Sequence, residues 1–300
     1  EQRALAQCSV FSGGFTPAAA SQVLELGEDA NTLDVIRSLR DKSLLRSYQP
    51  SPGEVRLALF ESVREFAADQ LEAMEQRRAT VARHEAFFLD TAERLASRNL
   101  DASQVLKHEV ENLMSIVERT LDVMPAAVPE LVAALRALAA LAPVFHTRGP
   151  VGVYLDWLDR ALGAAEACDE VPLPVLAKAY QARGKAQPQR GRALEGITDL
   201  TTALTMAKSA GDRSTKATIL TDLGVLYHHA REMDRAREHY QRALALHRGL
   251  GDRRAIGRVL GNLGALHHDL RDVDEALNYY NQALVIFREL GDRRFEGLLL

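Results

Sequence analysis

The sequence predicts an all-α fold in which a superhelix of helical repeats follows a small N-terminal domain. Hydrophobic residues make up 47% of the 300 residues and aromatic residues only 6%, so the core is built mainly from Leu, Ala and Val, a mix that favours helices. The tripeptide Gly-Asp-Arg begins at positions 211, 251 and 291, a period of 40 residues. The first 76 residues lack this period and contain a turn rich in Pro and Gly. We therefore expect two differently built regions.

Two sites near the N-terminus carry helix-start signals. Thr16 precedes Pro17, and a Thr cap followed by Pro in the first turn is typical of a helix N-terminus. Asn31 precedes Thr32 at the start of a second helical segment. We expect helices to begin at both places.

Two extended segments follow these helices. Residues 43–48 and 55–60 read as short strands on either side of the sequence Gln-Pro-Ser-Pro-Gly at 49–53. A further helix begins near Ser62. The order helix, helix, helix, strand, turn, strand is that of a winged helix, so residues 1–76 are predicted to form a winged-helix domain with a short β-hairpin. A helical linker is predicted over residues 77–128.

The repeat array is predicted over residues 129–300, and its clearest copies are 211–250 and 251–290. Gly251 is suited to end a helix in the left-handed conformation, and Asp252 is suited to cap the next helix. Each repeat is thus expected to form two antiparallel helices of roughly 16 residues.

Small and aromatic residues recur at the same 40-residue period. Gly224 and Gly264 allow a partner helix to approach closely, while Tyr240 and Tyr280 are expected to fill the space between repeats. A coiled coil would show a seven-residue period instead. The pattern therefore favours stacked helical pairs.

This pattern resembles the tetratricopeptide repeat family, in a variant with about 40 residues per unit. The resemblance is carried by Leu223, Gly224, Tyr227, Ala236, Tyr240 and Ala243, and again by Leu263, Gly264, Ala276, Tyr280 and Ala283. His267 departs from the aromatic residue expected opposite Tyr227. A weaker copy lies upstream with Gly184 and Ala203 in register, and residues 154–165 resemble the second helix of a more divergent pair.

Four further segments resemble the STAND signal-transduction ATPases of bacteria, relatives of the NB-ARC proteins. They are residues 9–16 (SVFSGGFT), 39–45 (LRDKSLL), 60–67 (FESVREFA) and 108–113 (HEVENL). The resemblance implies a nucleotide-switched signalling or transcriptional regulator whose ATPase domain lies upstream of Glu1. The winged helix would pack on that ATPase domain, and the repeats would act as its sensor. The start at Glu1 and the end inside a repeat at Leu300 fit a fragment of such a protein.

The phosphate-binding loop of an ATPase is missing from the sequence. Gly184 and Lys185 are followed by Ala186 where that loop requires Ser or Thr. No cofactor is therefore expected in this fragment, and ATP with Mg²⁺ is expected only in the upstream domain.

Charge argues against nucleic acid as the direct partner. The formal net charge is −4, and residues 1–76 carry seven Arg or Lys against twelve Asp or Glu, a net charge of 7 − 12 = −5. Contacts with phosphates supply much of the affinity for DNA, so an acidic module binds it poorly. Direct nucleic-acid binding is therefore not expected.

Cysteine usage and hydropathy indicate a cytoplasmic protein. Cys8 and Cys168 lie far apart without metal-ligand spacing, as in a reduced compartment. The apolar stretch 131–145 is interrupted by Arg136 and is too short to span a bilayer. No membrane partner is therefore expected.

Catalytic motifs are missing as well, so this fragment is not expected to be an enzyme. His84-Glu85 lacks the second His of a zinc-protease motif, and neither Cys-x-x-Cys nor Gly-x-Ser-x-Gly occurs. His228, His229 and His268, with Asp269 nearby, could hold a metal ion. We interpret them instead as solvated residues of a groove.

The first helices of the repeats are expected to line a concave surface that binds an extended peptide or a helix. The residues predicted to line it are Lys178, Gln181, Lys185, Thr218, Thr221, Val225, His228, His229, Arg258, Gly261, Ala265, His268 and Asp269. The ligand would be a partner protein, an inducer or the ATPase domain of the same chain. Two alternatives stay open: a stand-alone adaptor, and a DNA-binding transcription factor that acts through the winged helix.

Overall fold

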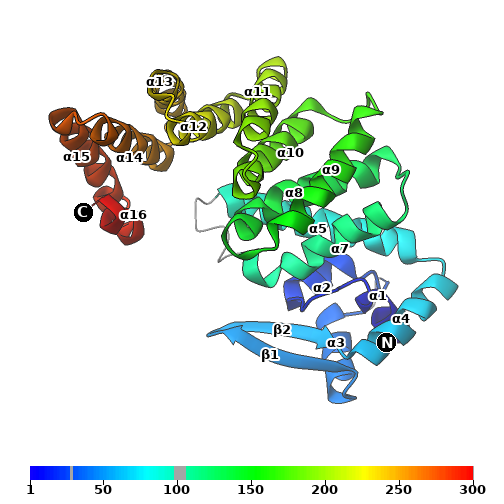
Figure 1. Ribbon diagram of the computed structural model, residues 1–300. Helices are drawn as coiled ribbons and strands as arrows, with labels where there is room; N and C mark the ends of the chain where they lie inside the picture. The colour runs from blue at the N-terminus through cyan, green and yellow to red at the C-terminus, as the bar shows by residue number, and fades with distance from the viewer. Residues whose placement is uncertain (28–29, 98–105, 300) are drawn as a thin grey trace. The chain divides into compact units, whose positions relative to one another are not determined.

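The computed structural model describes residues 1–27, 30–97 and 106–299 of the chain. They form two compact units, Glu1–Gly149 and Pro150–Leu300, which Figure 1 shows in blue to green and in green to red. The predicted domain limits, 1–76, 77–128 and 129–300, remain predictions. Each unit is described below by itself.

The first unit begins with the predicted winged helix. Its elements are α1 (Gln2–Cys8), α2 (Pro17–Val23), α3 (Thr32–Asp41), β1 (Leu45–Ser51) and β2 (Glu54–Leu59). Both predicted caps are confirmed. The Thr16 hydroxyl accepts a hydrogen bond from the backbone N–H of Ala19 at 3.1 Å, and the Asn31 side chain accepts one from Leu33 at 3.0 Å.

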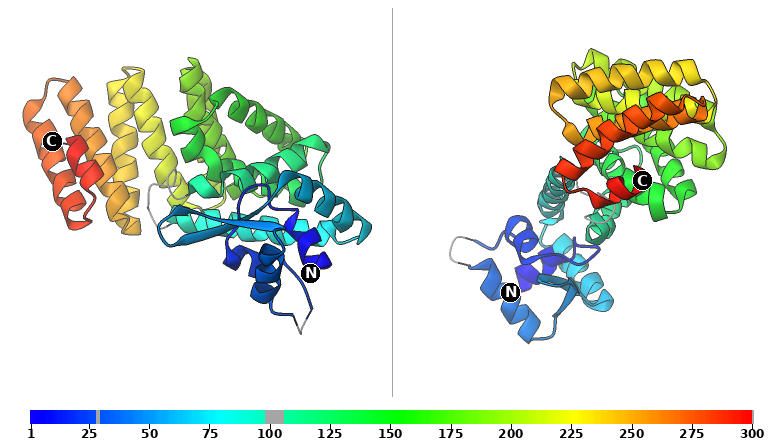
Figure 2. Two further views of the ribbon diagram at one scale, coloured as in Figure 1. Left: turned by 90° about the horizontal axis from the view of Figure 1, so that it is seen from below. Right: turned by 90° about the vertical axis from the view of Figure 1, so that its left-hand side faces the viewer.

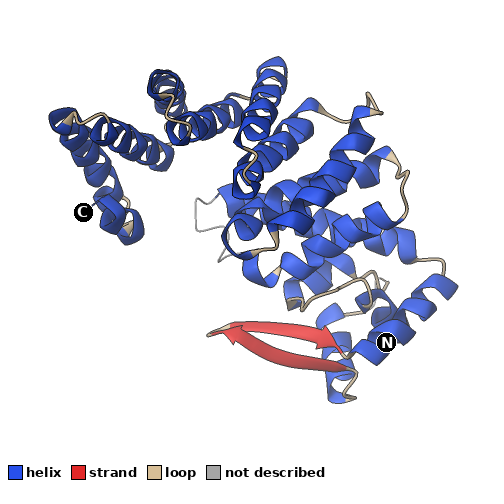
Figure 3. Cartoon of the chain, viewed as in Figure 1, coloured by secondary structure: helices blue, strands red, loops and turns tan. Residues whose placement is uncertain are grey.

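The hairpin pairs antiparallel, with Leu45 opposite Leu59, and Figure 3 shows its two strands in red. It turns at Gly53, whose φ of 83° is in the left-handed region that glycine adopts without strain. β1 begins and ends later than predicted, because Ser43 still belongs to the end of α3 with a φ of 60°. The strand then runs through Pro50, which an edge strand tolerates.

The core of the first unit centres on three phenylalanines. Phe11, Phe15 and Phe88 are at most 2% exposed. The rings of Phe11 and Phe15 stack with centroids 4.1 Å apart, and Phe88 meets Phe11 edge-on at 6.1 Å. Phe15 also exchanges two backbone hydrogen bonds of 2.8 Å with Leu57 of β2. This cluster therefore joins the loop before α2 to the hairpin and to α5.

Further helices complete the unit: α4 (Glu61–Ala73), α5 (Arg77–Ser97), a 3₁₀ turn η1 (Leu106–His108), α7 (Val110–Asp122) and α8 (Val128–Arg148). Within α8, Val128–Thr147 is long and apolar enough to cross a membrane by length and composition, with a mean hydropathy of 1.7. This helix is longer than the apolar stretch 131–145 predicted from the sequence. It packs against α5 and α7, and Arg136 on it binds Glu93 of α5 at 2.8 Å. We therefore interpret α8 as a core helix of this unit.

The second unit is a stack of helical pairs. Its elements are α9 (Val151–Glu166), α10 (Leu173–Ala186), the 3₁₀ turn η2 (Gln187–Arg190), α11 (Ala193–Ser209), α12 (Arg213–His229), α13 (Met233–Leu250), α14 (Arg253–Asp269), α15 (Val273–Glu289) and α16 (Arg293–Leu299). α10 pairs with α11, α12 with α13 and α14 with α15, and each pair contacts the next. Figure 2 shows the α12–α13 and α14–α15 pairs in yellow and orange. The predicted helical-repeat fold is confirmed.

The periodic residues explain this stacking. A Cβ added at Gly224 would lie 2.4 Å from Cδ1 of Tyr240, and one added at Gly264 would lie 2.5 Å from Cδ1 of Tyr280. The tyrosines therefore pack on glycines of their own repeat, and Tyr240 also belongs to a buried cluster with Val259, Leu260 and Leu263 of the next repeat, as predicted. The close approach follows from the missing glycine side chain, which leaves room for the ring.

The predicted helix end at Gly251 and helix cap at Asp252 are also confirmed. Gly251 ends α13 with a φ of 71°, and the Asp252 carboxylate accepts a hydrogen bond from the N–H of Ala255 at 3.0 Å. Arg231 and Arg271, in the short break inside each repeat, also have positive φ, at 61° and 64°. Left-handed residues thus mark both ends of each second helix.

His267 occupies the position that Tyr227 has in the preceding repeat, and its contact residue changes in the opposite sense, from His239 to Tyr279. In one repeat the ring of Tyr227 stacks on His239 at 5.2 Å, and in the next His267 faces Tyr279 at 5.3 Å. The aromatic and imidazole rings have exchanged helices while the contact is kept. His267 therefore conserves the packing of this position within the repeat.

Candidate partner-binding groove

The predicted groove residues lie on the first helices of three successive repeats. Lys178, Gln181 and Lys185 are on α10, Thr218, Thr221, Val225, His228 and His229 on α12, and Arg258, Gly261, Ala265, His268 and Asp269 on α14. The helical spacing of three or four residues brings each set to one face of its helix. Contacts between these helices show which of the residues come together.

The α10–α12 part of the groove is closed by its own side chains. The Gln181 amide donates to the Asp222 carboxylate at 2.6 Å and to the Thr218 hydroxyl at 3.2 Å. The Lys185 ammonium lies 3.4 Å from the other carboxylate oxygen of Asp222. We call these four residues the closed segment, since their polar groups satisfy one another. Asp222 was missed by the sequence analysis, although it lies one turn after Thr218.

A second carboxylate bridges α12 and α14. Asp269 accepts a hydrogen bond from Arg231 at 2.9 Å, and its same oxygen lies 3.2 Å from Nε2 of His228. His268 and His229 stay exposed beside this bridge. Arg231 was missed because it lies in the break after α12, where helical periodicity gives no signal.

Thr221 faces partly away from the groove. Its hydroxyl donates to the carbonyl of Ala217 at 3.1 Å and lies 3.4 Å from Nε2 of His247 on α13. His247 is 2% exposed, and burial lowers its pKa. Thr221 thus connects the groove face of α12 to the packing of its own repeat.

A cavity of about 330 Å³ opens beside Arg258. Its lining residues are Thr221, Asp222, Val225, Gly257, Arg258, Gly261, Asn262, Ala265, Tyr280, Phe287, Phe295 and Leu298. Arg258 is exposed, and within the described part of the chain its guanidinium has no hydrogen-bond or ion-pair partner. We call this cavity the Arg258 pocket. Of these residues, the sequence predicts Thr221, Val225, Arg258, Gly261 and Ala265 as groove residues, but not the walls from α15 and α16.

The alternative of a metal centre finds no donor set. Among residues 1–27, 30–97 and 106–299, no three His, Cys, Asp or Glu side chains lie close enough to hold a metal ion. The His228 and His229 rings have centroids 6.4 Å apart, and His228 faces a single carboxylate. We therefore keep the interpretation of these histidines as groove residues.

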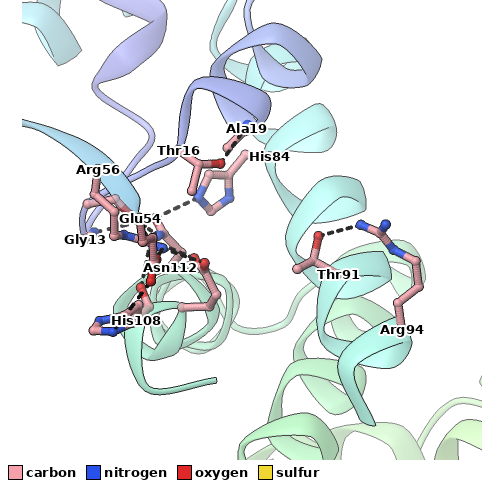
Figure 4. A network of polar contacts seen from close by, with 12 residues as sticks. Gly13, Thr16, Ala19, Glu54, Arg56, His84, Thr91, Arg94, His108 and Asn112 are labelled. Carbon is pink, nitrogen blue, oxygen red and sulfur yellow. Dashed lines mark hydrogen bonds and ion pairs between the residues drawn. The ribbon is translucent and has the colours of Figure 1, made fainter. Parts of the chain in front are cut away.

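A separate polar network, which no sequence motif indicates, lies in the first unit. Arg56 on β2 is 1% exposed, and its guanidinium binds both oxygens of the Glu109 carboxylate, at 2.7 and 2.9 Å. It also donates to the carbonyls of Gly14 and His108, and to Glu54 at 3.1 Å. Figure 4 shows Arg56, Glu54 and His108 of this network close together. A buried cation is thus neutralised where winged helix and linker meet.

Asn112 and His84 extend this network to α5. The Asn112 amide donates to the Gly14 carbonyl at 3.2 Å, and its oxygen lies 3.3 Å from Nε2 of His84. Arg119 lies 3.3 Å from Nδ1 of the same ring, so His84 is neutral and carries its proton on Nε2. Burial, together with the charge of Arg119, lowers the pKa of His84 to about 3.

Comparison with known proteins identifies both regions of the sequence. The winged helix-turn-helix domain family matches residues 2–72. The tetratricopeptide repeat family matches residues 176–249 and 215–289. No curated protein matches the chain.

Several solved structures share its fold at low sequence identity. BtubC from P. vanneervenii aligns with a TM-score of 0.51 and 18% identity, over 65% of this chain and 88% of BtubC. A STAND protein with a tetratricopeptide repeat sensor from Pyrococcus horikoshii aligns with a TM-score of 0.51 and 14% identity. That match covers 99% of this chain, which spans 52% of the STAND protein.

Aspartyl phosphate phosphatase F from Bacillus subtilis is similar at a TM-score of 0.51 and 12% identity, over 94% of this chain and 71% of its own. At such identities the likeness concerns the fold alone. Taken with the two matching families, it supports one statement about the molecule. The chain carries a winged helix-turn-helix domain followed by tetratricopeptide repeats.

Proposed function

We propose that the repeat unit is a protein-interaction scaffold whose groove, formed by α10, α12 and α14, binds an extended segment of a partner protein. The observation that carries this is the arrangement of polar groups along the groove. Exposed or half-buried side chains on the first helices of three successive repeats face one surface, and at Arg258 a cation is left without a partner in the described chain. Stacked repeats offer such continuous surfaces for extended ligands. We assign no catalytic role to these residues.

We further propose that this scaffold is the sensor of a STAND-type regulator. The support is the alignment of nearly the whole chain with about half of a STAND protein that has a repeat sensor. The remaining half of such a protein would hold the ATPase domain, with its ATP and Mg²⁺, and that domain would be a partner of the winged helix. Cys8 and Cys168, both free thiols, suit the cytoplasm, where we place this function.

The coding sequence upstream of Glu1 distinguishes the STAND-type regulator from a stand-alone adaptor. A Gly-x-x-x-x-Gly-Lys-Ser/Thr motif after an apolar strand is expected there. A parent sequence without such a loop would leave the adaptor as the function of the groove.

DNA binding through the winged helix is less favoured. On α3 the guanidinium of Arg40 binds Asp41 at 3.0 Å, and that of Arg37 lies 3.9 Å from Asp34. The cations of this helix are therefore partly neutralised by their own neighbours, in a domain that is acidic as a whole.

Selection of peptides on the full chain tests the scaffold. Random 12-residue peptides displayed on phage are selected against the immobilised protein, and affinities are then measured for His229→Ala and His268→Ala, two exposed residues of the groove. Each variant is expected to weaken binding about tenfold, the effect of roughly 1.4 kcal/mol. Arg242→Ala on the second helix α13 is the matched control and should bind as the parent does. Equal binding by all variants would place the ligand outside the groove.

A further inference from the structure

The 40-residue period allows two parts of the groove to be compared position by position. Gly261 and Ala265 on α14 occupy the places of Thr221 and Val225 on α12. The later repeat therefore has smaller side chains on its groove face, and the Arg258 pocket of about 330 Å³ lies over them. This volume is at the lower end of the range for ligand sites.

Part of the wall of this pocket is apolar. Phe295 of α16 stacks on Phe287 of α15, with ring centroids 4.9 Å apart and an interplanar angle of 12°. Leu298 on the next turn of α16 is 71% exposed, and Val225 of α12 also lines the pocket. A buried apolar side chain of a ligand would remove these surfaces from water.

The rim of the pocket carries an unneutralised cation. Three arginines lie near the start of α14, and two of them are paired: Arg253 with Glu289 and Arg254 with Asp292. Arg258 has no such partner among the described residues. Asp222 also borders the pocket, but Gln181 and Lys185 already hold its carboxylate. The free charge at the pocket is therefore positive.

These observations fix the chemistry of the occupant. We propose that the Arg258 pocket takes an apolar side chain of the partner segment, and that Arg258 binds an Asp or Glu side chain within one or two residues of it. A guanidinium binds a carboxylate with two parallel hydrogen bonds, which gives direction as well as affinity. The proposal rests on the proposed function, since it names the ligand of the same groove.

Charge reversal provides the test. The same phage library, displayed without free C-termini, is selected in parallel on the parent chain, on Arg258→Glu and on Arg253→Glu. The parent is expected to enrich an apolar residue next to Asp or Glu, and Arg258→Glu to enrich Lys or Arg at the acidic position. Arg253→Glu, which reverses a paired arginine on the same helix, should return the parent motif.

Filling the pocket provides a second readout. Gly261→Leu is expected to weaken the binding of the selected peptide at least about tenfold. An unchanged circular dichroism spectrum is the control for folding. A motif that lacks the acidic residue, or one that is identical on the parent and on Arg258→Glu, would overturn the proposal while leaving the scaffold function intact. Failure to enrich any peptide on the parent chain would overturn both.

Discussion

Each of the two units is stabilised internally by a different kind of contact. In the first, residues far apart in sequence meet in a buried polar network: Arg56 binds Glu109, 53 positions away, and His84 meets Asn112, 28 positions away. In the second, the same small and aromatic residues meet every 40 positions, as Gly224 meets Tyr240. A network concentrates stability in a few residues, whereas a repeat distributes it over many similar interfaces.

The largest effect is expected at the centre of the network. Arg56→Ala leaves the Glu109 carboxylate, 14% exposed, without its cation, and should lower the free energy of unfolding of the first unit by about 3–5 kcal/mol. Hydrogen exchange of α5 and α7 in increasing urea measures this loss. Fluorescence of Trp157, the only tryptophan of the chain, reports the second unit separately.

Arg46→Ala is the control for this change. Arg46 lies on the neighbouring strand, is exposed, and has its guanidinium 5.9 Å from the centre of the Phe60 ring. Its loss should change stability by less than about 1 kcal/mol. Equal effects of the two substitutions would show that the buried network does not dominate the stability of this unit.

A smaller effect is expected at one repeat contact. Gly224→Ala places a methyl group against the Tyr240 ring and should destabilise the second unit by about 1–3 kcal/mol, measured by Trp157 fluorescence in urea. A Cβ at Gly163, in the last turn of α9, meets no atom within 4 Å. Gly163→Ala should therefore stabilise the unit by roughly 0.5–1 kcal/mol. The account of this contact is wrong if both substitutions change the free energy of unfolding in the same direction.

The network also predicts a response to acid. The pKa of His84 is about 3 in the folded chain and near 6.5 when unfolded. The unfolded chain therefore binds more protons between these values, and stability falls as the pH drops through this window. The contribution of His84 to the fall in the free energy of unfolding approaches about 1.4 kcal/mol per pH unit.

The variant His84→Gln separates the contribution of His84 from that of the carboxylates, because it lacks the imidazole and keeps every carboxylate. The difference in free energy of unfolding between the parent chain and this variant, followed from pH 7 to pH 4, should shrink steadily on acidification. A constant difference would mean that His84 is not held neutral by its surroundings.

The smallest expected effect concerns the breaks inside the repeats. Arg271 has a φ of 64°, a conformation that strains residues with a side chain. Arg271→Gly should stabilise the second unit by about 0.5 kcal/mol. Arg242→Gly, in the interior of α13, should instead destabilise it by about 1 kcal/mol. Thermal unfolding of both variants decides whether the left-handed break is strained.

Sequence reasoning succeeded where signals are local or periodic. The caps at Thr16 and Asn31 and the stop at Gly251 depend on residues next to one another, and the 40-residue period placed the helical pairs. Arg56 gave no signal, because its partners come from separate elements and share no spacing. In the groove, Asp222 and Arg231 were missed for a related reason, since bridges between stacked helices depend on how the helices pack.

Binding in the groove is the central claim, and a footprint tests it most directly. The full chain is subjected to hydrogen exchange with and without a peptide selected from the library, and protection is read helix by helix. Protection concentrated on α12 and α14, reaching the pocket walls on α15 and α16 and leaving α13 unchanged, is the predicted result. Protection confined to the second helices, or to α3 and the hairpin of the winged helix, would contradict the account.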